Sequence, residues 1–531
     1  MMKRKNISQI IIQICVTLFF AVTIAAPIIT MFTRITGEGF RSLTSSSRFV
    51  PAVINSVTTA LTATIISMVL AICAAFSLRR TGIRGKSAFA MLFTVPMLIP
   101  SISHAYGLKA LFGVNGSGIL SAILGDNFSI FGFWGIVIGS VMYSFPVAFL
   151  MIYSILGYED GTPYKAAAVL GISLVRRFTG ITLPYLRKTL ISMFFAVFTM
   201  IITDYGVPQA LYTHDFGYTL SMLMFENVTE SYYSQAGVIG ILLLIPAVIA
   251  FTVDLFVPEL SQSSFVNEPV EETHSKPTAV LAYAFCVALS LFILAPIAAF
   301  VSQVFAKSYP NDLTFTLSHI KETFNTGADG FLINSLLYSF LSSVFGSAIA
   351  FICAYLTARH SGGLSRAIHL ASITSVAIPG LVLGLSYVIF FNRSPIYGTV
   401  FIIVLANSIH FFASPYLMMY NTLGKINPDL ESVGKTLGIK RIRIIINVII
   451  PKVRFTLYEM IVYFFVNSMM TISAVSLLAP PAPKPIAVMI SQSVSQMQIE
   501  KAAAVSLTIL VVNLAVKLIM SAIKRRSETT S

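Results

Sequence analysis

The sequence predicts an all-α membrane protein of about twelve transmembrane helices, arranged as two parallel six-helix repeats. Hydrophobic residues make up 56% of the chain and charged residues only 11%, whereas soluble domains carry about 25% charged residues. The mean hydropathy is +0.84. Long apolar runs recur throughout, and the second half repeats the pattern of the first. Such runs indicate helices, because lipid offers no partner to an unpaired backbone group.

The apolar runs set the expected number of helices. A run of about 18 or more apolar residues can cross the hydrocarbon core as a helix. The first run follows a basic N-terminus, as a signal peptide would, but it is longer than a signal peptide requires and lacks a clear cleavage site. We therefore expect a retained helix there. The twelve runs cover approximately residues 9–32, 55–78, 88–112, 131–156, 189–213, 236–257, 279–303, 334–357, 369–391, 397–421, 457–479 and 502–523.

The charge distribution predicts the orientation. A net charge of +14 would suggest nucleic acid as a partner for a soluble protein, but here the positive-inside rule explains it. Most Lys and Arg residues fall in alternate connections, including 79–86, 165–188 and 425–454. We expect a multi-pass protein of the inner (cytoplasmic) membrane, with both termini cytoplasmic and no nucleic-acid partner.

The chain is an internal duplication. The segment "NSVTTALTATIISMVLAICAAFSLRR" from Asn55 is echoed by "NSLLYSFLSSVFGSAIAFICAYLTAR" from Asn334, and Ile99-Pro100 matches Ile378-Pro379 at the same offset. Each half holds six predicted helices, an even number, so both copies enter the membrane in the same direction. The predicted boundaries are 1–257 for the first transmembrane repeat, 258–278 for a polar cytoplasmic linker and 279–531 for the second repeat.

A polar stretch also occurs twice, between the fourth and fifth apolar runs of each half. It reads "YKAAAVLGISLVRRFTGITLPYL" in the first half and "ESVGKTLGIKRIRIIINVIIPKV" in the second. Gly171 and Gly438, each within an identical "LGI", are expected to end a short helix, since glycine accepts the left-handed conformation that this requires. A second amphipathic segment is then expected to end at Pro184 and Pro451.

Local signals make each stretch a helix–glycine–helix element lying on the cytoplasmic face. Thr162-Pro163 and Asn427-Pro428 are typical helix starts. The first helix has one side of small residues that would let a partner backbone approach, which suits docking into a groove. An ordinary amphipathic helix resting on lipid headgroups is the alternative, and the repetition favours docking. The small residues are Ala166, Ala167 and Ala168 in the first copy and Ser432, Val433 and Gly434 in the second.

These stretches resemble the "EAA" loop of binding-protein-dependent ABC importer permeases, in which E-A-A-x3-G is followed 13 residues later by proline. The leading acid is replaced by Lys165 in one copy and Ser432 in the other. The resemblance implies a coupling loop that docks in the ATPase subunit. The residues that would form it are Lys165, Ala166, Ala167, Gly171, Pro184, Ser432, Val433, Gly434, Gly438 and Pro451.

The resemblance covers nearly the whole chain and is greatest to fused two-repeat permeases for iron(III), with thiamine and 2-aminoethylphosphonate relatives. It extends to "FFAVFTMIITDYGVPQAL" and "MMTISAVSLLAPPAPKPIAVMI". It implies the transmembrane fold of type I ABC importers. It also implies two copies of an ATPase subunit and an extracytoplasmic binding protein as partners. Iron(III) is the expected substrate on this ground alone.

No cofactor or catalytic site is expected in this chain. Gly85-Lys86-Ser87 copies the end of a phosphate-binding loop, but Arg80 stands where the first glycine is required and no strand is predicted before it. No nucleophile–base pair or metal-ligand spacing is found, and His104 and His410 are isolated. We therefore expect this chain to be no enzyme, with ATP and Mg²⁺ bound by the partner subunit.

Asp204 is the candidate residue of the transport pathway. Charged residues near membrane spans are expensive and often functional, and Asp204 has no acidic counterpart in the second half, where Thr471 stands. The alternative is that Asp204 caps a helix end.

A secondary transporter driven by an ion gradient is the alternative function, because a six-plus-six layout also describes the major facilitator class. That class carries an acidic signature between helices two and three. Here those loops read "RRTGIRGKSA" and "RHSGGLSRAI", without an acid. A membrane enzyme or scaffold is a third class, for which no catalytic constellation is found.

Overall fold

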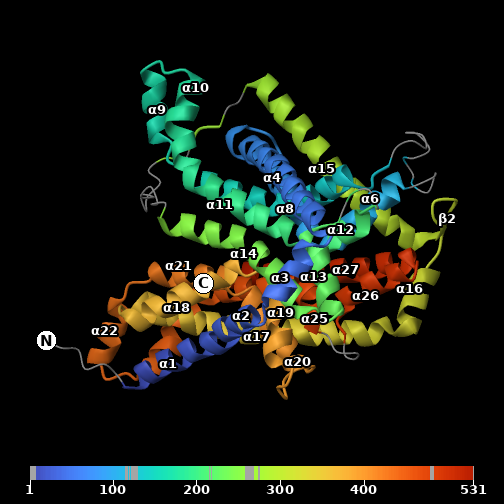
Figure 1. The fold of residues 1–531 in the computed structure, drawn as a ribbon. Helices are drawn as coiled ribbons and strands as arrows, with labels where there is room; N and C mark the ends of the chain where they lie inside the picture. The colour runs from blue at the N-terminus through green and yellow to red at the C-terminus, as the bar shows by residue number, and fades with distance from the viewer. Residues whose placement is uncertain are drawn as a thin grey trace. The chain divides into compact units, whose positions relative to one another are not determined.

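The fold of the chain is given by a computed structural model, drawn in Figure 1. It describes residues 7–113, 118, 120, 129–213, 216, 218–256, 268, 270–272, 275–478 and 484–529. Most of the predicted linker and most of the loop after Gly113 therefore lie outside the described residues.

The described elements are helices and one short antiparallel hairpin. In the first half they are α1 (Ile7–Phe20), η1 (Ala21–Ala25), α2 (Ala26–Thr33), α3 (Gly37–Thr44), α4 (Phe49–Arg80), α5 (Lys86–Thr94), η2 (Val95–Leu98), α6 (Ser101–Phe112), α8 (Phe133–Leu156), α9 (Thr162–Val169), α10 (Leu174–Arg177), η3 (Phe178–Thr182), α11 (Leu183–Ile202), α12 (Gly206–Leu211), α13 (Leu220–Thr229) and α14 (Tyr233–Phe256).

The second half repeats this order, with the hairpin inserted after its first helix. Its elements are α15 (Lys276–Phe305), β1 (Ala306–Ser308), β2 (Asp312–Phe315), α16 (Ser318–Thr323), η4 (Phe324–Ala328), α17 (Asp329–Arg359), α18 (Gly363–Thr374), η5 (Ser375–Ala377), α19 (Gly380–Phe391), α20 (Val400–His410), α21 (Ala413–Gly424), α22 (Asp429–Thr436), α23 (Arg441–Ile444), η6 (Ile445–Ile449), α24 (Ile450–Met470), α25 (Ser473–Leu478), α26 (Ile486–Ser495) and α27 (Ile499–Thr529).

The duplication is confirmed element by element. Helices α6 and α19 have the same length and lie at the offset of the Ile-Pro pairs, and α4 and α17 end at matching arginines. Three further pairs of elements each lie 267 residues apart, as the two polar stretches do: helices α9 and α22, helices α10 and α23, and the π-turns η3 and η6. The repeat is therefore a repeat of structure as well as of residues.

The all-α membrane class is confirmed, but the count of twelve spans is not. Among the described residues, seven helices are long and apolar enough to cross a membrane, or up to nine if each of two bent pairs is one span. The bends are 103° between α5–η2 and α6, and 56° between α20 and α21. Three further apolar helices are shorter: residues 233–249 of α14, α19 and α26.

Proline breaks two of the predicted spans, 88–112 and 369–391. Ile99 and Ile378 are extended, and helices α6 and α19 begin directly after Pro100 and Pro379. A residue before proline is disfavoured in the helical region, so the chain cannot run straight through either point. Nε2 of His104 lies 3.2 Å from the carbonyl oxygen of Pro96, which the break leaves without a helical partner.

The described chain forms two compact units, and each unit contains the first helix of the other sequence repeat. One unit contains residues 1–40, 227–240 and 321–531, and the other contains 41–226 and 241–320. Helices α1 and α2 accordingly pack on α18 and α19, while α15 packs on α4 and α6 (Figure 1). These units differ from the predicted repeats, which follow the order of the sequence. The repeat boundaries 1–257 and 279–531 stay a prediction.

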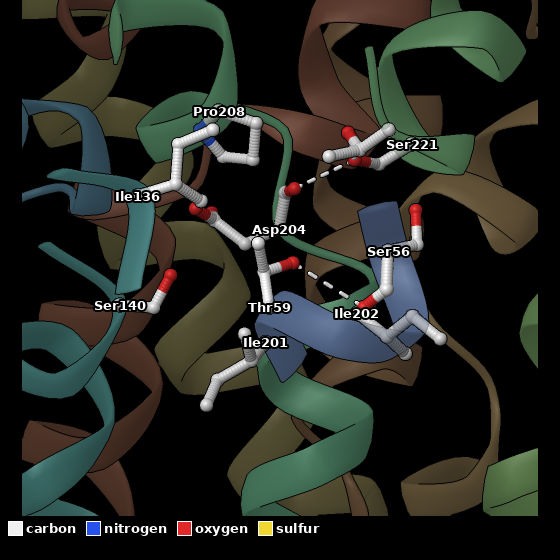
Figure 2. A pocket seen from close by; sticks show the side chains of 10 residues that line it. Ser56, Thr59, Ile136, Ser140, Ile201, Ile202, Asp204, Pro208 and Ser221 are labelled. Carbon is white, nitrogen blue, oxygen red and sulfur yellow. Dashed lines mark hydrogen bonds between the residues drawn. The ribbon is translucent and has the colours of Figure 1, made fainter. Parts of the chain in front are cut away.

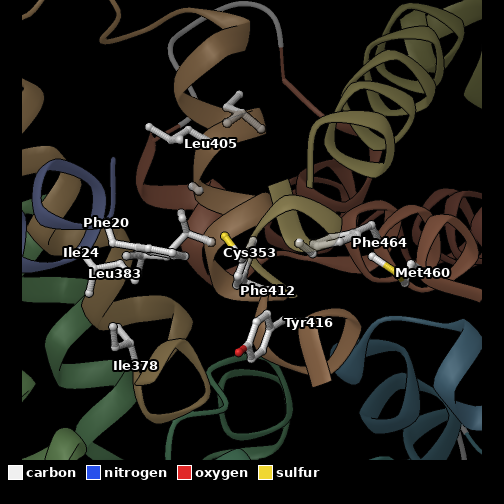
Figure 3. Close-up of a cluster of buried hydrophobic side chains, with 14 of the residues drawn as sticks. Phe20, Ile24, Cys353, Ile378, Leu383, Leu405, Phe412, Tyr416, Met460 and Phe464 are labelled. Carbon is white, nitrogen blue, oxygen red and sulfur yellow. The ribbon is translucent and has the colours of Figure 1, made fainter. Parts of the chain in front are cut away.

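The core of the first of these units surrounds α17 (Figure 3). Phe20 and Ile24, from the beginning of the chain, are buried within it. The ring of Phe20 packs edge-on against Phe412 at a centroid distance of 5.3 Å, and the Tyr387 hydroxyl donates to the Thr23 carbonyl at 2.8 Å. The first apolar run is therefore a helix that packs within this core.

In the other unit, α4 packs along α8 and α11, and α6 packs on α15 at a point without room for a side chain. A Cβ added at Gly107 would lie 2.5 Å from the backbone oxygen of Pro296. Because backbone cannot rotate away as a side chain can, Gly107→Val is expected to lower the thermal midpoint of the purified protein, by overpacking worth about 1–3 kcal/mol. Gly330→Val, which points into open space, is the control and should leave the midpoint unchanged. Equal midpoints would contradict the packing described.

Candidate functional site

The two repeated polar stretches have the same backbone geometry. Gly171 has φ +66° and Gly438 has φ +70°. The amide after each glycine donates to the carbonyl five residues earlier, at 3.0 Å and 2.9 Å respectively, which closes a Schellman-type helix end. The predicted helix–glycine–helix element is therefore present twice, as α9–α10 and α22–α23.

The expectation that the second segment ends at proline is wrong. The helix continues through Pro184 into α11 and through Pro451 into α24. Proline lacks an amide hydrogen and clashes with the preceding turn, and the π-turns η3 and η6 lie immediately before it in both copies. The amide of Leu183 accordingly donates to the carbonyl of Phe178, five residues back. Each helix–glycine–helix element is thus continuous with a long apolar helix.

The small residues of the first helix do not all face outward, which corrects part of the docking interpretation. Ala167 and Gly434 occupy the same position in the two copies, and both are buried. A Cβ on Gly434 would lie 2.4 Å from Cδ1 of Ile444, so the missing side chain lets the two arms of the element pack together. The small residues that do remain exposed are Ala166, Ala168, Ser432 and Val433, and Lys165 is exposed beside them.

Large apolar side chains form the exposed tip of each element, and residue-by-residue inspection of the sequence did not single them out. Leu170 is 75% exposed and Leu437 is 70% exposed, at equivalent positions beside the glycines. Val175 and Ile442, also equivalent, are 74% and 58% exposed. Apolar side chains that a defined turn holds outward are typical of a docking surface. They occur at equivalent positions in both elements. The identical "LGI" triplets were the available signal.

The caps of the first helices lie at equivalent positions in the two copies, Asp160 and Asn427. In α22, the Asn427 side chain accepts the amide of Asp429 at 2.9 Å, as predicted for a capping residue. In α9, the cap is Asp160 and not Thr162: its carboxylate accepts the amide and the hydroxyl of Thr162 at 3.1 Å and 2.8 Å. These hydrogen bonds lower the pKa of Asp160.

The described part of the linker contacts the first element. Lys165, which stands at the family's acidic position, pairs with Glu268 at 2.5 Å and Glu271 at 3.3 Å. The amide of Gly161 donates to the carbonyl of Glu268 at 2.8 Å. Since these side chains are about half exposed or more, water screens the ion pairs and they contribute little to the stability of the fold.

A buried ion pair joins the first element to the end of α4. Arg80 lies 2.5 Å from the carboxylate of Glu159, whose side chain is only 3% exposed. The Tyr164 hydroxyl also donates to Glu159 and shares a hydrogen bond of 2.6 Å with Thr182 in the π-turn. Burial raises the pKa of Glu159, against the opposing effects of Tyr164 and Arg80. Burial and the bond to Glu159 raise the pKa of Tyr164 to about 12.

The second element has the same connection, made with a different acid. Arg359, the counterpart of Arg80, lies 3.1 Å from the carboxylate of Glu431 in α22. Glu431 also accepts the Tyr355 hydroxyl at 2.8 Å and lies 3.5 Å from Arg441 at the start of α23. These ion pairs were missed because charge near a helix end was interpreted only as a signal of orientation.

Asp204 lies between α11 and α12, where it lines a small cavity (Figure 2). Its carboxylate accepts the Ser101 hydroxyl at 2.6 Å and the amide of Val207 at 2.9 Å, so it caps α12. The Ser221 hydroxyl donates to the Asp204 carbonyl at 2.7 Å. The cavity has room for about one water molecule. The capping alternative is therefore realised, and a role in the pathway stays a prediction.

The segment that copies a phosphate-binding loop lies at a helix connection, and a further ion pair joins two long helices. Gly85-Lys86-Ser87 connects α4 to α5, and Lys86 pairs with Glu272 at 2.6 Å. Glu459 pairs with Lys524 at 2.8 Å, joining α24 to α27. Over the residues for which coordinates are described, no group of three or more His, Cys, Asp or Glu side chains could hold a metal ion.

Curated proteins with similar sequences are transport permeases. The chain is 24% identical over 418 residues to the ferric transport system permease protein FbpB of Actinobacillus pleuropneumoniae, covering 76% of this chain and 61% of that protein. It is 23% identical over 420 residues to the putative ferric transport system permease protein FbpB 1 of Haemophilus influenzae, covering 76% and 66%. The matches thus span less than two thirds of these two relatives.

A more distant relative is the spermidine/putrescine transport system permease protein PotC of Haemophilus influenzae, 28% identical over 170 residues, or 32% of this chain and 62% of that protein. The sequence profile of one family matches residues 67–303 and again 331–529, which is most of the chain and one match per repeat. The chain therefore belongs to the family of binding-protein-dependent transport system inner membrane components.

Proposed function

We propose that this chain is the permease subunit of an ATP-binding-cassette importer, which moves a substrate delivered by an extracytoplasmic binding protein. The observation that carries the proposal is the pair of matching elements, α9–α10 and α22–α23, each with an exposed apolar tip and each continuous with a long apolar helix. A surface of this kind can receive force from a separate motor. Two elements call for two copies of an ATPase subunit.

The proposed orientation places both elements and both termini in the cytoplasm of the cell, because the basic residues gather in those connections. ATP and Mg²⁺ would bind to the ATPase partner, and this chain would carry no cofactor. The binding protein would deliver substrate at the opposite face. Asp204 is proposed to lie at that end of the pathway.

Iron(III) is the proposed substrate. The support is that two of the relatives with long matches are named as ferric transport permeases, whereas the spermidine/putrescine permease matches a shorter segment. A binding protein selects the substrate in such a system, so the permease itself needs no tight site.

The test is transport by vesicles that contain the chain, its ATPase partner and its binding protein. We expect uptake of iron(III) to require ATP inside the proposed cytoplasmic compartment and to persist after an ionophore collapses the ion gradients. Vesicles with the chain alone are the control and should not accumulate iron(III). Uptake by the chain alone, driven by an ion gradient, would instead establish the secondary transporter.

A further inference from the structure

Helices α4 and α17 are fastened in the same way at their N-terminal ends. In one half, the Asn55 side chain donates to the carbonyl of Tyr218 at 3.2 Å, and the Ser56 hydroxyl accepts the amide of Leu220 at 2.7 Å. In the other half, Asn334 donates to the carbonyl of Lys484 at 3.4 Å. The next residue, a serine there too, accepts the amide of Ile486 at 2.6 Å. The same Asn-Ser pair thus holds the segment before α13 and the segment before α26.

The opposite ends of the same helices hold the coupling elements. Arg80 ends α4 and pairs with Glu159, and Arg359 ends α17 and pairs with Glu431. A helix of this length measures about 48 Å, at about 1.5 Å per residue. Each helix therefore connects one coupling element, at its C-terminal end, to a segment held near its N-terminal end.

The acids that bind these arginines come from different positions in the two copies. Glu431 is the counterpart of Tyr164, and Glu159 is the counterpart of Ile426. The arginine of the second half compensates for this by also donating to the Ile426 carbonyl at 2.9 Å. The contact is thus kept although the residues that make it have changed.

Stability alone does not account for such a contact. Glu159 and Arg359 have side chains only 3% and 6% exposed, and a buried ion pair is often no more stabilising than apolar residues of the same size. Its advantage is a defined geometry, which is lost when either partner is removed. Finding the same geometry at both coupling elements points to a mechanical use.

We propose that α4 and α17 act as rods, which transmit displacement of the coupling elements to residues 218–220 and 484–486 through the arginine ion pairs and the Asn-Ser hydrogen bonds. Arg80, Glu159, Arg359 and Glu431 are then positioning residues that act through the helices. In the unit that contains α4, this helix reaches the Asp204 cavity, because Ser56 and Thr59 line it. The inference rests on the proposed function, since it needs a motor that moves the coupling elements.

The test compares complexes that carry Glu159→Gln and Glu431→Gln together with the unaltered complex. Three quantities are measured: retention of the ATPase partner, basal ATP hydrolysis, and iron(III) imported per ATP in the presence of the binding protein. We expect retention and basal hydrolysis to stay unchanged, and import per ATP to fall about tenfold. A second variant, Arg80→Lys with Arg359→Lys, leaves both glutamates in place and keeps a cation near each of them. This variant should retain most of the import per ATP.

Glu459→Gln is the matched control, because it removes another glutamate ion pair at an exposed position. It should leave all three quantities unchanged. Import per ATP at the unaltered level in the double glutamine variant would overturn the inference, as would a loss of import matched by a loss of retention, which is what a merely structural role predicts. Failure of the unaltered chain to retain any ATPase would instead overturn the proposed function.

Discussion

Valine at both Gly171 and Gly438 is expected to stop import while the partner continues to hydrolyse ATP. Both glycines have φ near +70°, where a residue with a side chain is strained by about 1–2 kcal/mol and a β-branched one by more. Nothing lies within 4 Å of the added Cβ at either position, so the effect arises from the backbone and not from a clash. The turn would re-form with another geometry, and force would no longer reach α11 and α24. The measurement is iron(III) imported per ATP hydrolysed in vesicles.

The control is Gly180→Val with Gly424→Val. Both of these glycines have ordinary φ values and open surroundings, so the same added side chains should be tolerated. A Gly171→Val, Gly438→Val variant that imports as well as this control would show that the left-handed turn is not needed for coupling.

The two helix–glycine–helix elements could be located from the sequence because their signals are local. An "LGI" triplet, a proline 13 residues after its glycine and a cap at the start all lie within one short segment. Glycine at positive φ and the Schellman-type end depend on neighbouring residues alone. The recurrence of the triplet and of its distance to the proline in the second half then distinguished these signals from chance.

Features that depend on distant contacts could not be predicted in this way. Hydropathy identifies an apolar helix but does not say on which core it packs. The packing of α1–α2 with the second repeat, and of α15 with the first, could therefore not be predicted. The breaks at Pro100 and Pro379 were foreseeable from the residue before proline. The uninterrupted apolar composition nevertheless led us to draw straight spans there.

The candidate site shows the same division. Small residues at Ala167 and Gly434 were taken as an outward surface, since spacing alone does not distinguish packing within an element from packing on a partner. The ion pair between Arg80 and Glu159 joins residues 79 positions apart. Its counterpart uses an acid at another position, so no alignment of the two halves would pair them.

Aspartate at both Leu170 and Leu437 is expected to release the ATPase partner. These side chains are 75% and 70% exposed in the chain by itself, and burying a leucine in an interface is worth about 1.5–3 kcal/mol. Loss of two such contacts, with two carboxylates left to desolvate, should weaken the complex at least about 100-fold. The measurement is the amount of ATPase that copurifies with the tagged chain, together with its dissociation constant for the purified chain.

Thr179→Asp with Asn447→Asp is the control, because both residues are exposed on the π-turns and the changes add the same two charges without removing apolar surface. The control should retain the partner. The thermal midpoint of the Leu170→Asp, Leu437→Asp variant should also be unchanged, since neither leucine is buried in the chain itself. Retention of the ATPase at the unaltered affinity by that variant would mean that the apolar tips do not form the docking surface, and the repeated turns would then need another explanation.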